Sequence, residues 1–434
     1  MLTPTRRRFQ LFEYGPSVDL TSMIVAVASV DRERARRLIE VAGERAAKTL
    51  RFKYNPLQTE AGNIRAIDFA GMIRLGPSLE LEIVPKFLGL SETQSRWRED
   101  FYFLANLSRH GRLLASERLW ASGQAPKDLA TLVARSLAGM YWDNRRRPLR
   151  SYRRMRVEDV FIDGEVDPVD IRFPTPDGFV QEIIRYDRSN AFNAAIQAAA
   201  KELLPEIGDS EAASGLIRIV QDLPAQKFNR IARKRPVPGR ARSWQPVIDL
   251  SHDVLEGFGL SYSQGYSTAP GYVLGTWQVW EDLLTIAVRL VYGSLASSQK
   301  EFHLGLRTSA PSGSTSNVRV YPDLTIVKTE TSPRFMIDAK YKTNSQKGGV
   351  RISEADIYEA LAFANAASCD NVILAYPALA TEGSRELGSV ATFEILRIDS
   401  VRIFGVQVEV RGISKRQGLK TFSERLKADL QRLL

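Results

Sequence analysis

The sequence contains very few residues of the types that build disulfides and zinc sites. Its 434 residues include one cysteine, Cys369, and three histidines, His110, His252 and His303. A single cysteine excludes an intramolecular disulfide and fits a reducing cytoplasm, where we expect the protein to reside. The histidines are scattered and lack the spacing of a zinc motif, so a His/Cys metal centre is not expected.

Long apolar runs and nucleotide-binding loops are also missing. The stretch TRRRFQLF (residues 5–12) looks like a twin-arginine signal, but the apolar segment MIVAVASV (residues 23–30) is short and DRERARR follows it at once. Neither an export signal nor a membrane span is therefore expected. The chain has no GxxxxGK[ST] loop, so it is not expected to bind a nucleotide in that manner.

The composition is that of a soluble globular protein with a basic charge balance. Hydrophobic residues make up 44% and charged residues 25%, and 60 Lys and Arg against 50 Asp and Glu give a net charge of +10. The charge favours polyanionic partners. The length predicts two or three domains. A basic stretch rich in Pro and Gly at 225–246 suggests an N-terminal region, 1–245, and a C-terminal domain, 246–434.

The N-terminal region reads as α+β. Charged and apolar spacing predicts a surface helix at 31–50, and alternating strands at 63–75 and 79–87 predict a hairpin. The other expected elements are helices at 98–115 and 126–144, two strands within 149–173 that turn near Asp163–Gly164, and a helix at 187–205 capped by Ser189 or Asn190.

The C-terminal domain reads as α/β, with a mixed central sheet flanked by helices. The expected order is a helix at 276–293, a loop at 310–317, strands at 318–328 and 334–342, a helix at 353–367 that opens on Ser353, and a buried strand at 371–377.

The strand FMIDAKYK (residues 335–342) carries two charges inside an apolar run. Asp338 and Lys340 are two residues apart and share one face. Pairing with the preceding strand can place Asp323 beside Asp338 at one end of the sheet. Two adjacent carboxylates repel each other unless a cation or proton lies between them, and hard oxygen ligands suit Mg²⁺. Lys340 could then orient or deprotonate a metal-bound water, or hold a phosphate.

The spacing Pro322-Asp323…Asp338-Ala339-Lys340 resembles the PD-(D/E)xK nuclease motif. The resemblance implies a restriction-endonuclease-like domain in which Asp323, Asp338 and the Ala339 carbonyl hold Mg²⁺, with Mn²⁺ as a substitute, and Lys340 is catalytic. It also implies a glutamate from the upstream helix, for which Glu281 fits and Asp282 is an alternative. Asp356 and Tyr358 could steady Lys340, or be a helix cap and a core aromatic residue.

Several segments together resemble the McrC family, the nuclease subunits of McrBC-type modification-dependent restriction systems. They are GMIRLGPSLELEIVPKF, NAFNAAIQAAAKELL and PDLTIV…MIDAKYK…SEADIYEALAFA…VILAYP, with EIVPK and DAKYK…DIY the most specific. The sequence departs from the family at Gly164-Glu165, where Gly-Arg is usual, and at Glu359, where Gln is common. The first departure is expected to alter substrate or partner contacts, and the second is expected to leave the metal site unchanged.

The McrC resemblance implies a partner. An AAA+ GTPase would sense modified DNA and translocate, while this subunit inserts its N-terminal part into the motor ring, stimulates GTP hydrolysis and cuts DNA within a larger hetero-oligomer. The segments 63–87 and 145–173 are candidates for the inserted stalk. Two rival functions remain open: a nuclease that acts with another ATPase or helicase or alone, and a catalytically silent adaptor between motor and DNA.

Two basic clusters are candidates for contacts with DNA or with the partner, although a charge run is often only a solvated face. Aromatic residues such as Tyr152, Phe228 and Trp244 interleave with them. The first cluster consists of Arg145, Arg146, Arg147, Arg150, Arg153 and Arg154, followed by Arg156, and the second of Lys227, Arg230, Arg233, Lys234 and Arg235, followed by Arg240 and Arg242.

Overall fold

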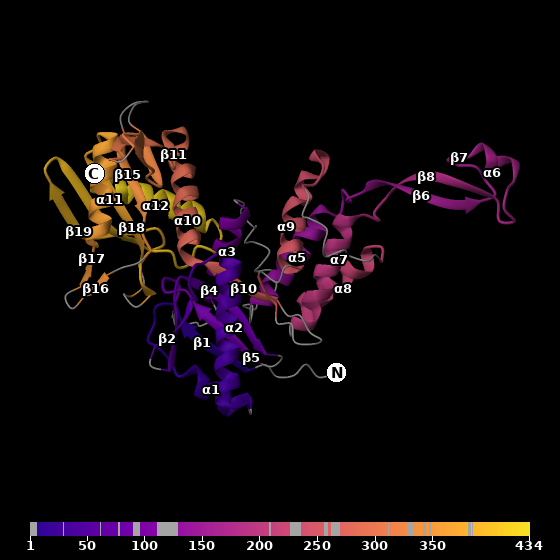
Figure 1. The fold of residues 1–434 in the computed structure, drawn as a ribbon, viewed down its shortest axis with the longest axis horizontal. Coiled ribbons are helices and arrows are strands. Elements are labelled where there is room, and N and C mark those ends of the chain that lie inside the picture. The colour runs from indigo at the N-terminus through magenta and orange to yellow at the C-terminus, as the bar shows by residue number, and fades with distance from the viewer. Residues whose placement is uncertain are drawn as a thin grey trace. The chain divides into compact units, whose positions relative to one another are not determined.

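The computed structural model shows two compact units (Figure 1). The inserted unit comprises residues 130–271, and the main unit comprises residues 6–129 and 272–434, which flank it in the sequence. These units do not coincide with the expected division at residue 245, because the N-terminal strands and helices group with the C-terminal part. The structure describes residues 7–28, 30–60, 62–76, 79–89, 96–110, 129–207, 210–225, 236–255, 259–261, 270–310, 312–327, 333–341, 344–346, 349–380, 383 and 385–434.

The first sheet of the main unit combines three strands that precede the inserted unit in the sequence with one strand at the point where the chain leaves that unit. Strand β1 runs parallel to β5, and β4 pairs antiparallel with both β5 and β10. The predicted hairpin is confirmed as β4–β5. All six residues of β5 are buried, so this hairpin belongs to the core and is not a protruding stalk. The strands that this sheet takes from the main unit are β1 (Arg7–Phe12), β4 (Phe69–Gly76), β5 (Leu79–Val84) and β10 (Pro270–Gly275).

Helices and a small hairpin accompany this sheet. Helix α2 begins where the Asp31 carboxylate accepts a hydrogen bond from the Arg34 N–H (2.7 Å), which satisfies an otherwise free donor of the first turn, and the helix contacts β4. The elements are α1 (Leu20–Ala28), α2 (Arg32–Leu50), β2 (Leu57–Glu60), β3 (Asn63–Ala66) and α3 (Arg96–His110).

The second sheet of the main unit confirms the expected mixed α/β layer. Its strand order is β11-β14-β15-β18-β20-β19, with β15, β18 and β20 parallel to one another. The strands are β11 (Ala296–Ser298), β14 (Leu324–Val327), β15 (Pro333–Ala339), β18 (Asn371–Pro377), β19 (Val390–Ile398) and β20 (Val401–Val408). As predicted, the wholly apolar strand at 371–377 lies inside the sheet, where it is buried on both faces.

Helices cover both faces of this sheet. Helix α11 packs on the face that includes Met336, Val372 and Leu374. Alternation turns Phe335 to the opposite face, where Tyr292 of α10 meets it edge-on with ring centroids 5.9 Å apart. The remaining elements of this part are α10 (Thr276–Tyr292), η3 (Gly293–Leu295), β12 (Phe302–Thr308), β13 (Thr315–Val320), β16 (Asn344–Gln346), β17 (Gly349–Arg351), α11 (Glu354–Ala367) and α12 (Gly418–Leu433).

The predicted strand 318–328 is divided into two. Residues 315–320 form β13, which pairs with β12, whereas residues 324–327 form β14, which pairs with β15. The expected loop at 310–317 is therefore strand from Thr315 onward. The break falls at Pro322, which has no N–H to donate to a ladder. As a result Asp323 lies immediately before the first residue of β14.

The inserted unit is a helical body from which a long hairpin extends. The helical elements are α5 (Leu129–Asn144), α7 (Ala191–Leu203), η1 (Leu204–Glu206), α8 (Ser210–Asp222), η2 (Gly239–Trp244) and α9 (Gln245–Leu255), followed by the short strand β9 (Gly259–Ser261). Asn190 is the N-cap of α7, where its side chain accepts from the Asn193 N–H (2.9 Å). None of the helices formed by the described residues is long and apolar enough to cross a bilayer.

The hairpin, residues 151–187, is called the finger below. Its long strands are β6 (Ser151–Asp159) and β8 (Phe179–Asp187), paired antiparallel along their whole length, and its end holds β7 (Glu165–Val166) and α6 (Pro168–Arg172). Two strands do lie within 149–173 as predicted, β6 and β7, but they do not form a hairpin with each other, because each pairs with β8. Asp167 instead caps a short helix by accepting from the Val169 N–H (2.8 Å), and Pro168 supplies its first residue.

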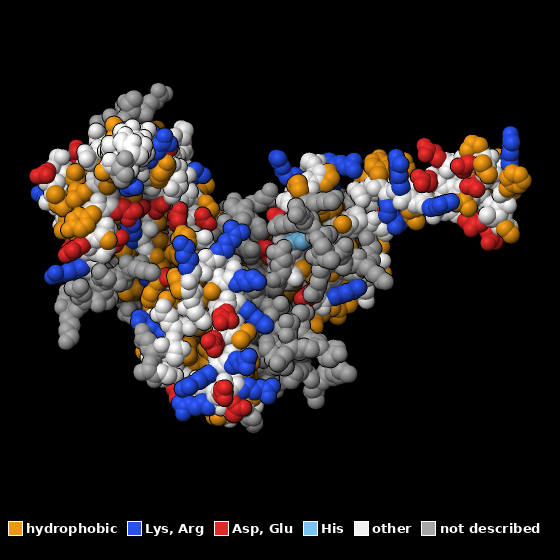
Figure 2. Space-filling view, viewed as in Figure 1, with side chains coloured by type: hydrophobic (Ala, Val, Ile, Leu, Met, Phe, Trp, Pro, Cys, Tyr) orange, Lys and Arg blue, Asp and Glu red, His pale blue; other side chains and the backbone are white. Residues whose placement is uncertain are grey.

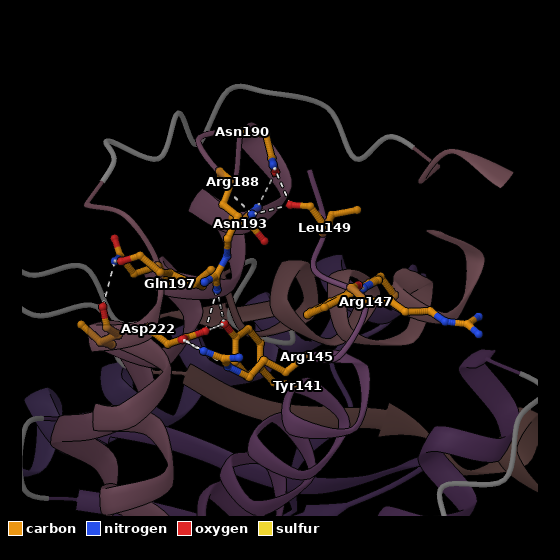
Figure 3. A network of polar contacts seen from close by, with 12 residues as sticks. Tyr141, Arg145, Arg147, Leu149, Arg188, Asn190, Asn193, Gln197 and Asp222 are labelled. Atoms are coloured by element: carbon orange, nitrogen blue, oxygen red, sulfur yellow. Dashed lines mark hydrogen bonds and ion pairs between the residues drawn. The ribbon is translucent and has the colours of Figure 1, made fainter. Parts of the chain in front are cut away.

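A polar network holds the base of the finger on the helical body (Figure 3). The Asn193 amide donates to the carbonyl oxygens of Leu149 (2.8 Å) and Arg188 (2.7 Å), which lie just outside the two finger strands. Asp222 accepts hydrogen bonds from Tyr141 (2.5 Å), Arg145 (2.7 Å) and Arg188 (2.6 Å). Both strands of the finger are thus tied to helices α5, α7 and α8.

Candidate active site

The ends of β14 and β15 bring two aspartates together. The two strands pair antiparallel with Leu324 opposite Ile337, so Asp323 and Asp338 flank that pair. The Ala339 N–H donates to Asp323 Oδ2 (2.8 Å), which fixes this carboxylate against the neighbouring strand. Asp338 is only 4% exposed, because the residues before it in β15 are core. The two carboxyl groups therefore share a site that is largely shielded from water.

Lys340 lies among carboxylates. Its Nζ is 2.6 Å from Asp338 Oδ2, 2.6 Å from Glu359 Oε2 and 3.6 Å from Asp356 Oδ1. Its backbone N–H donates to the Ala375 carbonyl of β18 (2.9 Å), so the residue continues the line of the sheet. The sequence suggested no role for Glu359 in the site. The structure shows that this acid reaches the lysine directly.

Glu281 of α10 is linked to Asp323 through a glutamine, Gln299, that the sequence did not reveal. The Gln299 amide donates to Asp323 Oδ1 (2.8 Å) and to Glu281 Oε1 (3.4 Å), and the Gln299 N–H donates to the Asp323 carbonyl (3.0 Å). Of the two acids left open by the sequence, Glu281 makes this connection. Gln299 follows a three-residue strand and adopts a left-handed φ of 50°, and no motif marks it.

Three acids of the site share a raised pKa. Burial raises the pKa of Asp338 to about 7, against the opposing effect of Lys340, and the charges of Asp323 and Glu359 add to the rise. Burial also raises the pKa of Asp323, to which Glu281 adds, and the pKa of Glu281, to which Asp282 and Asp338 add. Each of these acids makes it harder for the others to ionise. A divalent cation bound between them would favour their ionised forms.

Lys340 carries a firmly held proton in this arrangement. Burial by itself would lower the pKa of its ammonium, but the charge and hydrogen bond of Asp338, with those of Glu359, outweigh burial and raise it. The lysine is therefore cationic at neutral pH. It can hold an anionic phosphate oxygen or donate a proton, whereas taking a proton from water would first require a change in its partners.

The donor set fits a magnesium ion held partly by water. In the described part of the chain no three His, Cys, Asp or Glu side chains stand close enough to hold a metal by themselves. The protein can offer the carboxylates of Asp323 and Asp338 and a backbone carbonyl such as that of Ala339, with Glu281 connected through Gln299. Mg²⁺ suits such a set, because it commonly keeps several waters and binds one or two carboxylates.

The two residues expected to support Lys340 behave differently. The Asp356 carboxylate is 3.6 Å from Lys340 Nζ and accepts from the Tyr376 hydroxyl (3.1 Å). Tyr358 is 66% exposed and turned to solvent, so it does not support the lysine here. The supporting tyrosine is Tyr376 of β18, which is 1% exposed. Its position at the end of a buried strand is the sequence signal that could have found it.

The basic residues of the first cluster belong to the inserted unit and are not part of this catalytic group. Arg145 is exposed but paired with Asp222 (2.7 Å). Arg153 pairs with Asp187 (3.4 Å) on the finger, and Arg154 is exposed on β6. Arg146, Arg147 and Arg150 are also exposed. The residues of the second cluster, Lys227, Arg230, Arg233, Lys234 and Arg235, lie outside the described residues.

Comparisons with known proteins point to one family. The family described as "McrBC 5-methylcytosine restriction system component" matches residues 64–377. This chain is similar, at 13% identity and a TM-score of 0.69, to a chain in the refined half-complex of Thermococcus gammatolerans McrB AAA+ hexamers with bound McrC, and the match covers 99% of this chain and 100% of that one. That likeness shows a shared fold.

A second solved structure and the curated proteins add no further argument. A chain of the Thermococcus gammatolerans McrBC complex matches at 13% identity and a TM-score of 0.45, over 68% of this chain and 90% of that one. No curated protein matches the sequence.

Proposed function

This chain belongs to the family of McrBC 5-methylcytosine restriction system components, and on that premise we propose that it is a Mg²⁺-dependent PD-(D/E)xK endonuclease subunit. It would cut DNA as part of a restriction or phage-defence complex. The observation that carries the proposal is the pairing of the buried Asp338 with the half-buried Asp323 at the sheet end. The Ala339 N–H donates to Asp323, and the Lys340 ammonium lies 2.6 Å from Asp338.

The proposed chemistry divides between the acids and the lysine. Asp323, Asp338 and the Ala339 carbonyl would hold Mg²⁺, or Mn²⁺ in its place. When bound, the ion would polarise the scissile phosphate and activate a water molecule. The Lys340 ammonium orients the phosphate and donates a proton to the leaving oxygen as its bond to phosphorus breaks. Asp338 and Glu359 keep Lys340 protonated, and the Asp356 carboxylate, 3.6 Å from its Nζ, helps to hold it in place.

Cleavage by conservative variants tests this assignment. Asp323→Asn and Asp338→Asn should each abolish Mg²⁺-dependent cleavage, because each removes a charge that balances the cation. Asp399→Asn is a matched control, since Asp399 is exposed in the turn between β19 and β20. Cleavage is measured with the partner present and Mg²⁺ below saturation. Wild-type rates from either site variant would show that the metal assignment is wrong.

We also propose that the finger contacts an AAA+ GTPase partner and stimulates it. In the similar structure, McrB AAA+ hexamers have McrC bound. Large apolar side chains gather at the end of the finger (Figure 2), and such a patch is typical of a protein interface. Six of these residues are 50–75% exposed: Val160, Phe161, Ile162, Val169, Ile171 and Phe173.

Hydrogen bonds from one buried side chain order the loop at the end of the finger. Gln181 of β8 is 2% exposed, and its side-chain oxygen accepts from the N–H groups of Asp163 (2.7 Å) and Gly164 (2.8 Å). Its amide donates to the Phe161 carbonyl (2.5 Å). The loop that carries Val160 to Ile162 is therefore ordered before any partner binds, which lowers the entropy cost of binding.

A tip variant tests the partner assignment. Phe161→Asp combined with Phe173→Asp should remove most stimulation of GTP turnover by the cognate motor, because charge replaces the apolar contact. Ile395→Asp changes another exposed apolar residue, on β19 in the main unit, and should leave stimulation unchanged. If the tip variant stimulates the motor like the wild type, the finger is not the stimulating contact.

A further inference from the structure

A buried carboxylate at the end of β1 lies between the two elements that carry the proposed site. Glu13 is 1% exposed. Its Oε1 accepts a hydrogen bond from Thr276 Oγ1 (2.5 Å), and Thr276 is the first residue of α10, the helix of Glu281. Its Oε2 accepts from the Tyr341 hydroxyl (2.5 Å), and Tyr341 follows Lys340 directly. One side chain thus joins the start of α10 to the end of β15.

Lys86 is a second residue from the N-terminal part of the chain that contacts the end of β15. Its ammonium donates to the Tyr341 carbonyl and lies 4.0 Å from the centroid of the Tyr341 ring. Its backbone N–H donates to Glu13 Oε2 (3.2 Å), so the two residues support each other. Lys86 is the lysine of EIVPK and Tyr341 the tyrosine of DAKYK. The two most specific segments of the family resemblance therefore meet in space.

Burying the Glu13 carboxylate costs folding free energy. Burial raises the pKa of Glu13 to about 7, although Lys86 and the hydrogen bonds of Thr276 and Tyr341 oppose the rise. A buried polar group of this kind could be replaced by apolar side chains of similar volume at little or no loss of stability. Its partners are residues of the two site-bearing elements, which indicates a role in placing them.

We propose that Glu13 is a positioning residue of the nuclease site. By binding Thr276 and Tyr341 at once, it sets the position of the Glu281 helix relative to the Asp338–Lys340 strand end. The inference rests on the proposed nuclease function. It means that the residue after β1 helps to fix the geometry of the catalytic site. Displacement of reacting groups by about 1 Å can cost on the order of 10²-fold in rate.

Glu13→Gln is the direct test, because it keeps the volume but turns a donor toward a hydroxyl that was donating. With the full-length protein, its partner and saturating DNA, we expect single-turnover cleavage to fall about 10- to 100-fold while DNA affinity stays within about twofold. Glu409→Gln is the matched control. Glu409 is 0% exposed and bound by Arg411 (2.5 Å), so its loss costs stability but should not slow cleavage below the unfolding temperature.

Two single substitutions separate the two hydrogen bonds. Thr276→Val removes the donor on α10, and Tyr341→Phe removes the donor on the strand end. Each should slow cleavage in the wild-type background and add little in the Glu13→Gln background, because the bond is already lost. Full additivity of the effects on log rate would show that Glu13 does not act through these partners.

Amide hydrogen exchange of the protein alone distinguishes this inference from the proposed function. Glu13→Gln should speed exchange in both 276–282 and 336–341, whereas Glu409→Gln should leave both segments unchanged. Unchanged exchange in either segment would overturn the bridging role, whatever the cleavage assays show. If the wild-type protein never cuts DNA, the nuclease proposal fails, and with it the catalytic purpose of the bridge, even where exchange demonstrates that the bridge exists.

Discussion

Asp338→Asn should stabilise the metal-free protein while it abolishes cleavage. Burial raises the pKa of Asp338 from 3.8 to about 7. An acid whose pKa rises on folding binds its proton more tightly in the folded protein. Its contribution to stability is therefore full below the unfolded pKa and is lost as the pH rises from 3.8 through about 7. At neutral pH and above, the ionised aspartate destabilises the fold.

The size of the effect follows from the two pKa values. The difference between 3.8 and about 7 corresponds to about 4 kcal/mol of stability lost at pH 8 and about 2 kcal/mol at pH 5. Asparagine has nearly the same shape and no charge. We therefore expect Asp338→Asn to exceed the wild type in unfolding free energy by up to about 4 kcal/mol at pH 8, and by about half of that at pH 5.

Urea unfolding in the presence of a chelator, at pH 5 and pH 8, measures this difference. Asp399→Asn should match the wild type at both pH values. Added Mg²⁺ should raise the stability of the wild type, because it binds the folded site, and should have much less effect on Asp338→Asn. A variant that is less stable than the wild type at pH 8, or a difference that does not change with pH, would refute the reasoning.

Three further outcomes are expected. Lys340→Ala should lose about 10²-fold or more in cleavage rate with DNA affinity retained, and Lys340→Arg should not restore it, because guanidinium cannot give up a proton at working pH; full activity of the Arg variant would make Lys340 a phosphate clamp. The pKa of Asp222 falls to about 2: burial opposes this, but the hydrogen bonds of Arg188, Tyr141 and Arg145 outweigh it. Asp222→Asn should therefore cost about 2 kcal/mol in urea unfolding at pH 7, a difference that shrinks as the pH falls from 3.8 through 2; a cost that persists at pH 2 contradicts the pairing. Gly164→Ala should disorder the finger tip and reduce GTPase stimulation, because an added Cβ would lie 2.2 Å from the Glu182 carbonyl oxygen; unchanged stimulation would exclude a role for the ordered tip.

Local sequence signals determined much of the secondary structure. The spacing of apolar residues predicted α2 and α10, and capping residues helped to predict α7 and α11, because a helix needs only its own periodicity and a side chain for its first free N–H groups. Alternation and a turn predicted β4–β5, and a wholly apolar run predicted β18. The spacing of Asp323, Asp338 and Lys340 identified the candidate catalytic group, because i and i+2 on one strand share a face and an antiparallel partner adds its own end.

Local sequence signals did not show which distant strand each strand pairs with. The two strands expected within 149–173 are present as β6 and β7, but their own sequences did not show that both pair with β8, which lies beyond the helix that Asp167 and Pro168 start. The compact units differ from the expected division at residue 245 for the same reason. Strands from residues 7–12 and 69–84 join a sheet with β10, and nothing in their own sequences names that partner.

The sequence by itself thus determined the element types, the family resemblance and the identity of the candidate catalytic residues. Only the tertiary structure decided what surrounds them: Gln299 between Glu281 and Asp323, Glu359 against Lys340, and Glu13 between α10 and β15. The periodicity and spacing of residues determine which side chains of one segment lie on the same face of its helix or strand. Contacts between residues separated by tens to hundreds of positions depend on how the sheets and helices pack, and that packing is a property of the whole unit.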